Sequence, residues 1–195
     1  MHVRNTLTLL LSLCMSASFS VNALADDRSK SATASASTEH PAILFEQHAT
    51  SLQSWMEQAY ASNPNELKKS TQVSPREMVE WVFHGPFNWK FDAIQSLQHS
   101  EALKLCVSDD FPGDRILAFT AGTYTLLSGY FETLHQKETS DKKSITEVML
   151  EIKMTLNTLL QNNHNPASNI TLSTAEHEAF ITLLHKIESD ALKAQ

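Results

Sequence analysis

The sequence of 195 residues predicts an all-α fold, a single-domain bundle of about six helices around a central apolar helix at about 113–136. Apolar residues recur at spacings of three and four through six blocks of the chain, which is the period of one helix face. All six prolines lie at block edges or between blocks, where a missing backbone N–H is harmless. They are Pro41, Pro64, Pro75, Pro86, Pro112 and Pro166. Only residues 169–172 resemble a strand.

The first 25 residues have the order of a cleavable secretory signal peptide. Arg4 is the only early charge, and an apolar run follows from Leu7 through Met15. The small residues of Ala23-Leu24-Ala25 then form a cleavage site. Because a membrane-spanning helix needs about 20 apolar residues, this run is too short to remain as an anchor. We therefore expect cleavage after Ala25 and a protein of the periplasm or the secreted fraction.

The chain is acidic. Its formal net charge is −7, and loss of residues 1–25 removes Arg4 and no acidic residue, which gives −8 for the mature protein. This balance disfavours nucleic acids, whose binding relies on clustered Lys and Arg. Residues 26–38 are rich in Ser, Ala and Thr and are expected to form a flexible tether. Residues 39–195 are expected to form one all-α globular domain.

The first three helical blocks cover about 40–62, 75–84 and 90–107. The first has an apolar stripe and ends at residues 63–65. Its stripe consists of Phe45, Ala49, Leu52, Met56 and Ala59. The second begins with a capping box of Ser74 and Glu77 and stops at Gly85. Its apolar residues are Met78, Val79, Trp81, Val82 and Phe83. The third contains Phe91, Ile94, Leu97, Leu103, Leu105 and Cys106, with a possible new start at Ser100-Glu101.

The fourth block, at about 113–136, is apolar on more than one face, which is typical of a helix at the centre of a bundle. Ala118, Gly122, Thr125 and Gly129 form a line of small residues that would let another helix approach closely. No charge lies between Arg115 and Glu132, but this stretch is too short for a bilayer. We therefore expect a core helix, and no integral membrane protein after signal cleavage. The three aspartates at 109, 110 and 114 suit the positive end of this helix.

The fifth and sixth blocks are amphipathic helices. The fifth, at about 142–162, places six apolar residues on one face: Ile145, Val148, Met149, Ile152, Leu156 and Leu159. The sixth begins with a capping box at Ser173 and Glu176 and continues towards Gln195. It is expected to bury Phe180, Leu183, Leu184, Ile187 and Ala191.

An aromatic segment joins the second and third blocks, in a connection that would normally be polar. It contains Phe83, His84, Phe87, Trp89 and Phe91. These rings either fold over the bundle and close its core, or form an exposed patch that binds a partner. The sequence leaves both interpretations open.

A metal- or haem-binding bundle is the alternative interpretation. Glu132 and His135 have the Glu-x-x-His spacing of di-metal bundles, although no second copy of this motif is present. His177 lies one turn before the apolar stripe of the last block and, with Met56, could serve as a haem ligand pair. No Cys-x-x-Cys-His motif for covalent haem is present. We accordingly expect no cofactor.

Cys106 is the second candidate for chemistry, since Cys14 leaves with the signal peptide. Cys14 follows Leu13 inside the apolar run, which does not fit a lipidation site. A lone thiol in an apolar patch is expected to be buried and inert. A cysteine-dependent enzyme would need Cys106 to be activated, with His99 seven residues earlier as its nearest base.

The leading hypothesis is therefore an exported, non-catalytic helical accessory protein that binds through the aromatic segment. The expected partner is another envelope or secreted protein, or a hydrophobic ligand. Nothing in the sequence predicts an oligomeric state.

Overall fold

The computed structural model describes residues 41–136, 143–161 and 170–195, and every regular element among them is helical. The elements are α1 (Pro41–Ser62), α2 (Pro64–Ser70), α3 (Pro75–His84), the 3₁₀ turn η1 (Asp92–Ile94), α4 (His99–Cys106), α5 (Arg115–Gln136), α6 (Ile145–Leu160) and α7 (Thr174–Lys193). The predicted all-α fold is confirmed. The described residues all belong to one compact unit, and the expected boundaries at residues 25 and 38 lie outside the described part of the chain.

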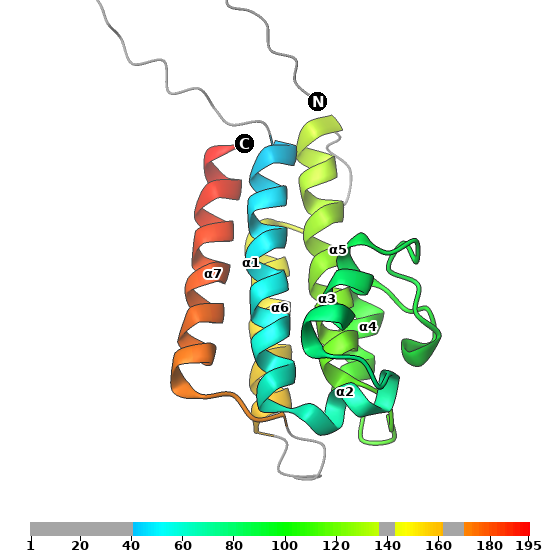
Figure 1. Ribbon diagram of the computed structural model, residues 1–195. Helices are drawn as coiled ribbons and strands as arrows, with labels where there is room; N and C mark the ends of the chain where they lie inside the picture. The colour runs from blue at the N-terminus through cyan, green and yellow to red at the C-terminus, as the bar shows by residue number, and fades with distance from the viewer. Residues whose placement is uncertain (1–40, 137–142, 162–169) are drawn as a thin grey trace, which may run out of the picture. The chain divides into compact units, whose positions relative to one another are not determined.

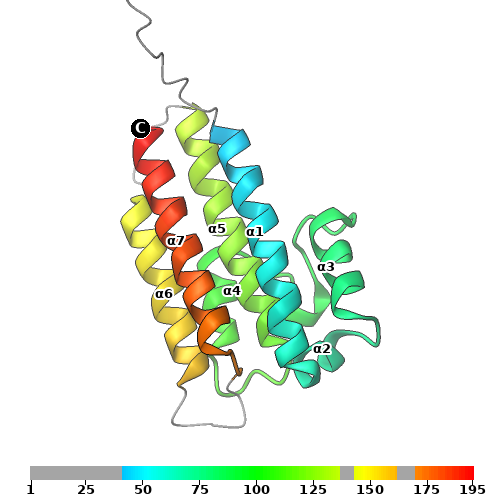
Figure 2. The ribbon, with the colours of Figure 1, turned by 60° about the vertical axis from the view of Figure 1, so that its left-hand side comes forward.

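Four long helices form an antiparallel bundle. In Figure 1, α1 lies between α5 and α7 with α6 behind it, and Figure 2 shows α6 beside α7. α1 and α6 run in one direction, and α5 and α7 run in the other (Figure 1). The remaining helices are added to this bundle: α3 packs against α1, and α4 packs against α5 and α6. All of α2, α3, η1 and α4 therefore belong to the connection between α1 and α5.

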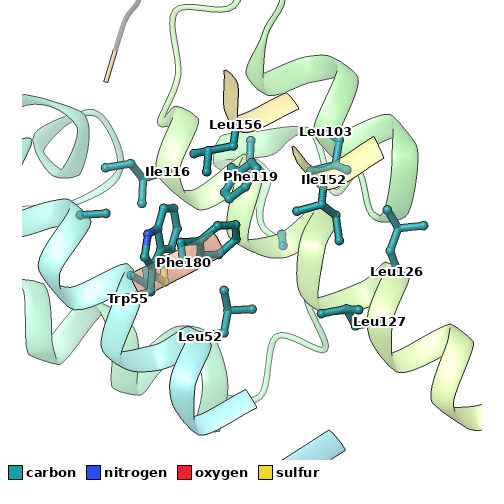
Figure 3. Packing of buried hydrophobic residues seen from close by; sticks show 14 of the residues in the cluster. Leu52, Trp55, Leu103, Ile116, Phe119, Leu126, Leu127, Ile152, Leu156 and Phe180 are labelled. Carbon is teal, nitrogen blue, oxygen red and sulfur yellow. The ribbon is translucent and has the colours of Figure 1, made fainter. Parts of the chain in front are cut away.

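The core is centred on aromatic rings from three helices of the bundle. Trp55 of α1 and Phe180 of α7 have ring centroids 4.6 Å apart, and Phe119 of α5 lies 5.3 Å from Trp55 (Figure 3). All three rings are buried among aliphatic side chains that include Leu156 of α6. Each buried aromatic side chain contributes several kcal/mol to the free energy of folding, so this cluster anchors the four helices together.

The central helix predicted at about 113–136 is α5, whose residues 115–123 are all buried. The small-residue line has the expected role, because α4 approaches α5 at Gly122. A Cβ atom on Gly122 would lie 2.7 Å from the Leu103 side chain and 3.0 Å from the His99 carbonyl oxygen. Thr125 adds a hydrogen bond by accepting from the His99 N–H at 2.7 Å. None of the helices in the described part of the chain is long and apolar enough to cross a membrane.

Helix starts follow the predicted caps. Ser173 and Glu176 form the predicted capping box of α7, and Ser144 forms another with Glu147 at α6, which the sequence prediction did not include. At α3, Ser74 accepts a hydrogen bond from the Glu77 N–H, which is one half of the predicted box. Each cap satisfies backbone N–H groups that the first helical turn leaves without an internal partner.

Two boundaries of the prediction are wrong. Residues 63–65 were predicted to end the first helix. They also begin the short helix α2, because Pro64 occupies its first turn. Proline is favoured there, since its fixed φ suits a helix start and its missing N–H is not needed. The block predicted at about 90–107 is divided into η1 and α4, with left-handed backbone at Gln95 and Ser96 between them, and α4 begins at His99, beside the predicted new start at Ser100-Glu101. Residues other than glycine rarely adopt that backbone conformation, and it cannot continue a right-handed helix.

Candidate binding site

The aromatic segment begins with a tight turn at the end of α3. The Gly85 N–H donates to the Trp81 carbonyl oxygen at 3.0 Å. A Cβ atom at position 85 would lie 2.2 Å from that same oxygen. Only glycine permits this approach, so the chain leaves α3 directly after His84 and runs back along the bundle.

Two rings of the segment face inward. Trp89 stacks on Tyr124 of α5, with ring centroids 3.8 Å apart and planes 18° from parallel. Phe83 meets Trp89 edge-on at 4.9 Å. Both side chains are half-buried and pack against the hydrophobic core. They therefore cover the side of α5, as the interpretation of a core-closing connection predicts.

The backbone between these rings is strained. Asn88 and Trp89 have φ angles of 48° and 62°, in the left-handed region that bulky residues rarely adopt. Such a conformation costs about 1–3 kcal/mol and persists only where surrounding contacts hold it. The Trp89–Tyr124 stack is one such contact, and the Gln98 side-chain amide donates to the Asn88 carbonyl oxygen at 2.9 Å. The strained turn allows Trp89 to face inward while Phe87, two residues earlier, stays at the surface.

Two other rings face solvent beside a pocket. Trp81 is 42% exposed and Phe87 is 46% exposed, values that are high for large apolar side chains. Together with Phe91 they line a pocket of about 240 Å³, and the Phe87 and Phe91 ring centroids are 5.4 Å apart. The rest of the lining consists of Ser70, Thr71, Met78, Val82, Lys90, Asp92, Ala93 and Leu117. The pocket has an aromatic wall, and aromatic residues are enriched at protein-binding hot spots, whereas charged residues such as Lys90 and Asp92 are typical of the rim of an interface.

The predicted patch is thus divided between two roles. Phe83 and Trp89 hold the segment against α5, Phe87 and Phe91 line the pocket, and His84 is exposed without lining it. Trp81 was assigned to the apolar stripe of its helix and is instead part of the site. A helical wheel carries the missing signal, since Trp81 lies about 105° from the centre of the face formed by the buried Met78, Val79 and Val82.

No known family model matches this chain, and no curated protein or solved structure matches it either. Three other groups of polar or reactive side chains lie outside the pocket. They are a buried acidic cluster, Cys106 and the residues of the alternative metal site.

A buried acidic cluster joins α1, α2 and α5. Asp114 caps the start of α5 by accepting from the Leu117 N–H at 2.9 Å, as the acidic loop predicts. Its other oxygen accepts from the Tyr60 hydroxyl at 2.7 Å and the Ser70 hydroxyl at 2.9 Å. Burial raises the pKa of Asp114 from 3.8 to about 6, although the three hydrogen bonds favour its charged form. This carboxyl group therefore ties three helices together.

A second carboxylate completes the cluster. Glu66 of α2 accepts from the Arg115 backbone N–H at 2.9 Å and pairs with Lys69 at 2.5 Å. The buried Arg115 guanidinium donates to the carbonyl oxygens of Cys106 at 2.6 Å and Phe111 at 2.8 Å. Because these carboxylate and guanidinium groups already bind protein donors and acceptors, the cluster positions the ends of α2, α4 and α5.

Cys106 is buried, as predicted, and its environment opposes catalysis. The thiol donates to the Leu103 carbonyl oxygen at 3.0 Å, and burial raises the pKa of the thiol well above its usual range. A nucleophilic cysteine needs the opposite shift, towards the thiolate. The structure therefore gives no support to the cysteine-dependent enzyme.

The alternative metal site is not assembled. His177 lies in the first turn of α7, whereas Glu132 lies near the other end of that helix, where the Gln195 amide donates to the Tyr130 hydroxyl at 2.7 Å. A helix of 20 residues is about 30 Å long, too far for one ion. The His135 side chain lies outside the described residues. Among the described residues, no three His, Cys, Asp or Glu side chains could hold a metal ion.

Proposed function

We propose that this protein is an exported, non-catalytic helical binding protein that holds a partner protein at the pocket between α3 and η1. The observation that carries the proposal is the exposure of Trp81 and Phe87 beside that pocket. Tryptophan and other aromatic residues are concentrated in the few positions that dominate binding energy at interfaces. A strained turn that keeps Phe87 at the surface is consistent with a selected binding site, because strain clusters at functional positions.

The size of the pocket favours a protein partner over a free hydrophobic ligand. Pockets for drug-sized ligands have volumes of about 300–1,000 Å³. The aromatic pocket, at about 240 Å³, is smaller and suits one large apolar side chain that projects from a protein surface. Lys90 and Asp92 supply charged groups beside the rings, where ion pairs contribute orientation more than affinity. The mature chain, with a net charge of −8 after loss of Arg4, would steer a basic partner towards the protein.

A comparison of affinity captures tests the proposal. Wild-type protein and the variants Trp81→Ala, Phe87→Ala and Ile43→Ala would each be used to capture proteins from the envelope or secreted fraction of the source cells. Ile43 is a matched control, because it is 55% exposed on α1 and does not line the pocket. We expect a partner that is retained by wild type and Ile43→Ala and lost with both pocket variants. A capture pattern that is identical for all four proteins would overturn the proposal.

Export is proposed on the N-terminal pattern of one early charge, an apolar run and a small-residue site. Intact mass measurement of the protein from fractionated cells tests this part separately. We expect a chain that begins at Asp26 in the periplasmic or secreted fraction. A chain retaining residues 1–25 in the cytoplasmic fraction would contradict it.

A further inference from the structure

The aromatic pocket has a polar side that a buried carboxyl group supports. Ser70 and Leu117 both line the pocket, and each forms a hydrogen bond with Asp114, which does not line it. The Ser70 hydroxyl donates to Oδ2 of Asp114 at 2.9 Å, and Oδ1 accepts from the Leu117 N–H at 2.9 Å. Asp114 is completely buried. The pocket therefore lies one hydrogen bond away from a buried titratable group.

The other donors around Asp114 fix the direction of the Ser70 hydrogen bond. The Leu117 donor is a backbone N–H, which cannot reverse. The Tyr60 hydroxyl donates to the same Oδ2 at 2.7 Å, and its side chain is completely buried, so its proton has no water to turn to. Of the three donors, only Ser70 is partly exposed. Ser70 is therefore the donor that can change its hydrogen bond at least cost.

The Ser70 hydroxyl has one proton and two lone pairs, so a hydroxyl that donates inward offers only its lone pairs outward. While Asp114 is ionised, Ser70 presents an acceptor and no donor to the pocket. We propose that the pocket holds a tyrosine side chain of the partner protein, whose hydroxyl donates to Ser70. The tyrosine ring then packs against Trp81, Phe87 and Phe91. This inference rests on the binding function proposed above and names the residue that enters the site.

Other side chains fit this pocket less well. Phenylalanine or leucine would cover the Ser70 oxygen without giving it a donor, and a polar group that is buried without a partner costs affinity. Lysine and arginine carry donors, but the lining has one charge of each sign, Lys90 and Asp92, and so does not select a cation. Tyrosine combines a ring for the aromatic wall with a donor at its end, and it is enriched at binding hot spots.

The same hydrogen bond makes the preference depend on pH. Burial, and to a smaller extent the charge of Glu66, raises the pKa of Asp114 to about 6. Below that pH, Oδ2 carries a proton that needs an acceptor. Since Tyr60 remains a donor, Ser70 accepts this proton and turns its own towards the pocket, where it no longer selects a donor. The charged side chains in the cluster around Asp114 are those of Glu66, Lys69 and Arg115.

Binding of small probes to the isotope-labelled mature protein tests the inference. The probes are p-cresol, which is the side chain of tyrosine, and p-methylanisole, which keeps the ring and the oxygen but has no donor. The shift of the Trp81 indole N–H signal, identified by its loss in Trp81→Phe, reports binding in the pocket. At a pH of about 7.5 we expect a Kd of about 1–10 mM for p-cresol, as is usual for so small a ligand. The Kd for p-methylanisole should be at least about fivefold higher, the factor of one typical hydrogen bond.

The ratio of the two Kd values should respond to pH and to two substitutions. In wild type it should fall below about two at a pH of about 5, where Asp114 is protonated. In Ser70→Ala and Asp114→Asn it should be below about two at both pH values. Alanine removes the acceptor, and the asparagine amide donates to Ser70 and turns the serine proton towards the pocket. Circular dichroism would confirm that both variants are folded.

Ser54→Ala is the matched control. Ser54 is an exposed serine of α1 whose hydroxyl donates to the Thr50 carbonyl oxygen at 3.3 Å, and it does not line the pocket. This variant should keep the wild-type ratio at both pH values.

Equal affinities of the two probes for wild type, or a ratio that persists in Ser70→Ala, would overturn the inference. So would the absence of any shift at Trp81, or tighter binding of skatole, which is the side chain of tryptophan. The comparison in wild type decides the inference even if a variant does not fold. A partner captured by wild type and lost with Trp81→Ala and Phe87→Ala would still support the binding function where the choice of tyrosine fails.

Discussion

The four long helices bury all of their described aromatic rings except the partly exposed Tyr124, whereas the connection between α1 and α5 leaves Trp81 and Phe87 more than 40% exposed. In the bundle, Trp55, Phe119 and Phe180 are placed by helical period, and each ring contacts rings from other helices. In the connection, ring positions depend on a glycine turn and on left-handed residues. Aromatic residues are therefore buried where the helical repeat places them, and two of them are exposed where a local turn places them.

This difference separates stability from binding. A ring at the centre of the bundle lies within a closely packed core, where its removal leaves a cavity. Removal of a ring at the surface of the connection costs the protein little stability. Such a ring can therefore be selected for contact with another molecule. The substitutions below compare the two regions, beginning with the largest expected effect on the free energy of unfolding.

Phe180→Ala in the bundle should have the largest effect. The ring is buried against Trp55 and Phe119, at centroid distances of 4.6 and 5.5 Å. Truncation of a buried phenylalanine costs about 3–5 kcal/mol through lost burial and the cavity that remains. Urea denaturation followed by circular dichroism measures the change. A loss below about 1 kcal/mol would show that this ring is not part of the core.

The acidic cluster that joins the two regions should make stability depend on pH. Because burial raises the pKa of Asp114 from 3.8 to about 6, the folded state binds this proton more tightly than the unfolded state. Its contribution is therefore fully present below the unfolded pKa and is lost as the pH rises through about 6. The nearby charge of Glu66 also raises the pKa of Asp114, whereas the hydrogen bond from Tyr60 lowers it.

Asp114→Asn isolates this contribution, since asparagine retains an acceptor for the Leu117 N–H but does not titrate. Between pH about 4 and about 7, the free energy of unfolding of wild type should fall relative to the variant by roughly 2 kcal/mol. Thermal and urea unfolding at several pH values measure this difference. A difference that stays constant with pH would mean that Asp114 does not titrate in this range.

The bundle could be predicted from sequence because its information is local and periodic. The stripes of three and four residues identified α1, α5, α6 and α7, and Ser173 with Glu176 identified the start of α7. The small face around Gly122 even predicted a close helix neighbour, although it did not show that this neighbour is α4. These features depend on helix geometry, which is the same in every helix.

The candidate site could be predicted only in part. Its composition indicated an aromatic patch, but two of the predicted rings, Phe83 and Trp89, face inward. The direction of each ring depends on the φ angles of Asn88 and Trp89 and on the stack with Tyr124, which is 35 positions away in sequence. No sequence pattern predicts left-handed backbone at a tryptophan, since that conformation is unfavourable without its tertiary contacts.

Trp89→Ala tests how firmly the connection is held to the bundle. We expect a loss of about 2 kcal/mol, because the half-buried ring stacks on Tyr124 and meets Phe83 edge-on. Trp89→Gly should be no more destabilising than Trp89→Ala, since glycine adopts a φ of 62° without strain. Urea denaturation of both variants gives the comparison. If the glycine variant is clearly less stable than the alanine variant, position 89 is not left-handed in solution.

The double variant Trp81→Ala/Phe87→Ala should have the smallest effect on stability and the largest on binding. Both side chains keep more than 40% of their surface in water, and so their removal should change the free energy of unfolding by less than about 1 kcal/mol. The capture experiment with the same protein should lose the partner, because the aromatic wall of the pocket is gone. Phe180→Ala, studied at a temperature where it stays folded, should show the reverse: low stability with the partner retained. If the double variant unfolds as readily as Phe180→Ala, the exposed rings belong to the core, and the separation of stability from binding fails.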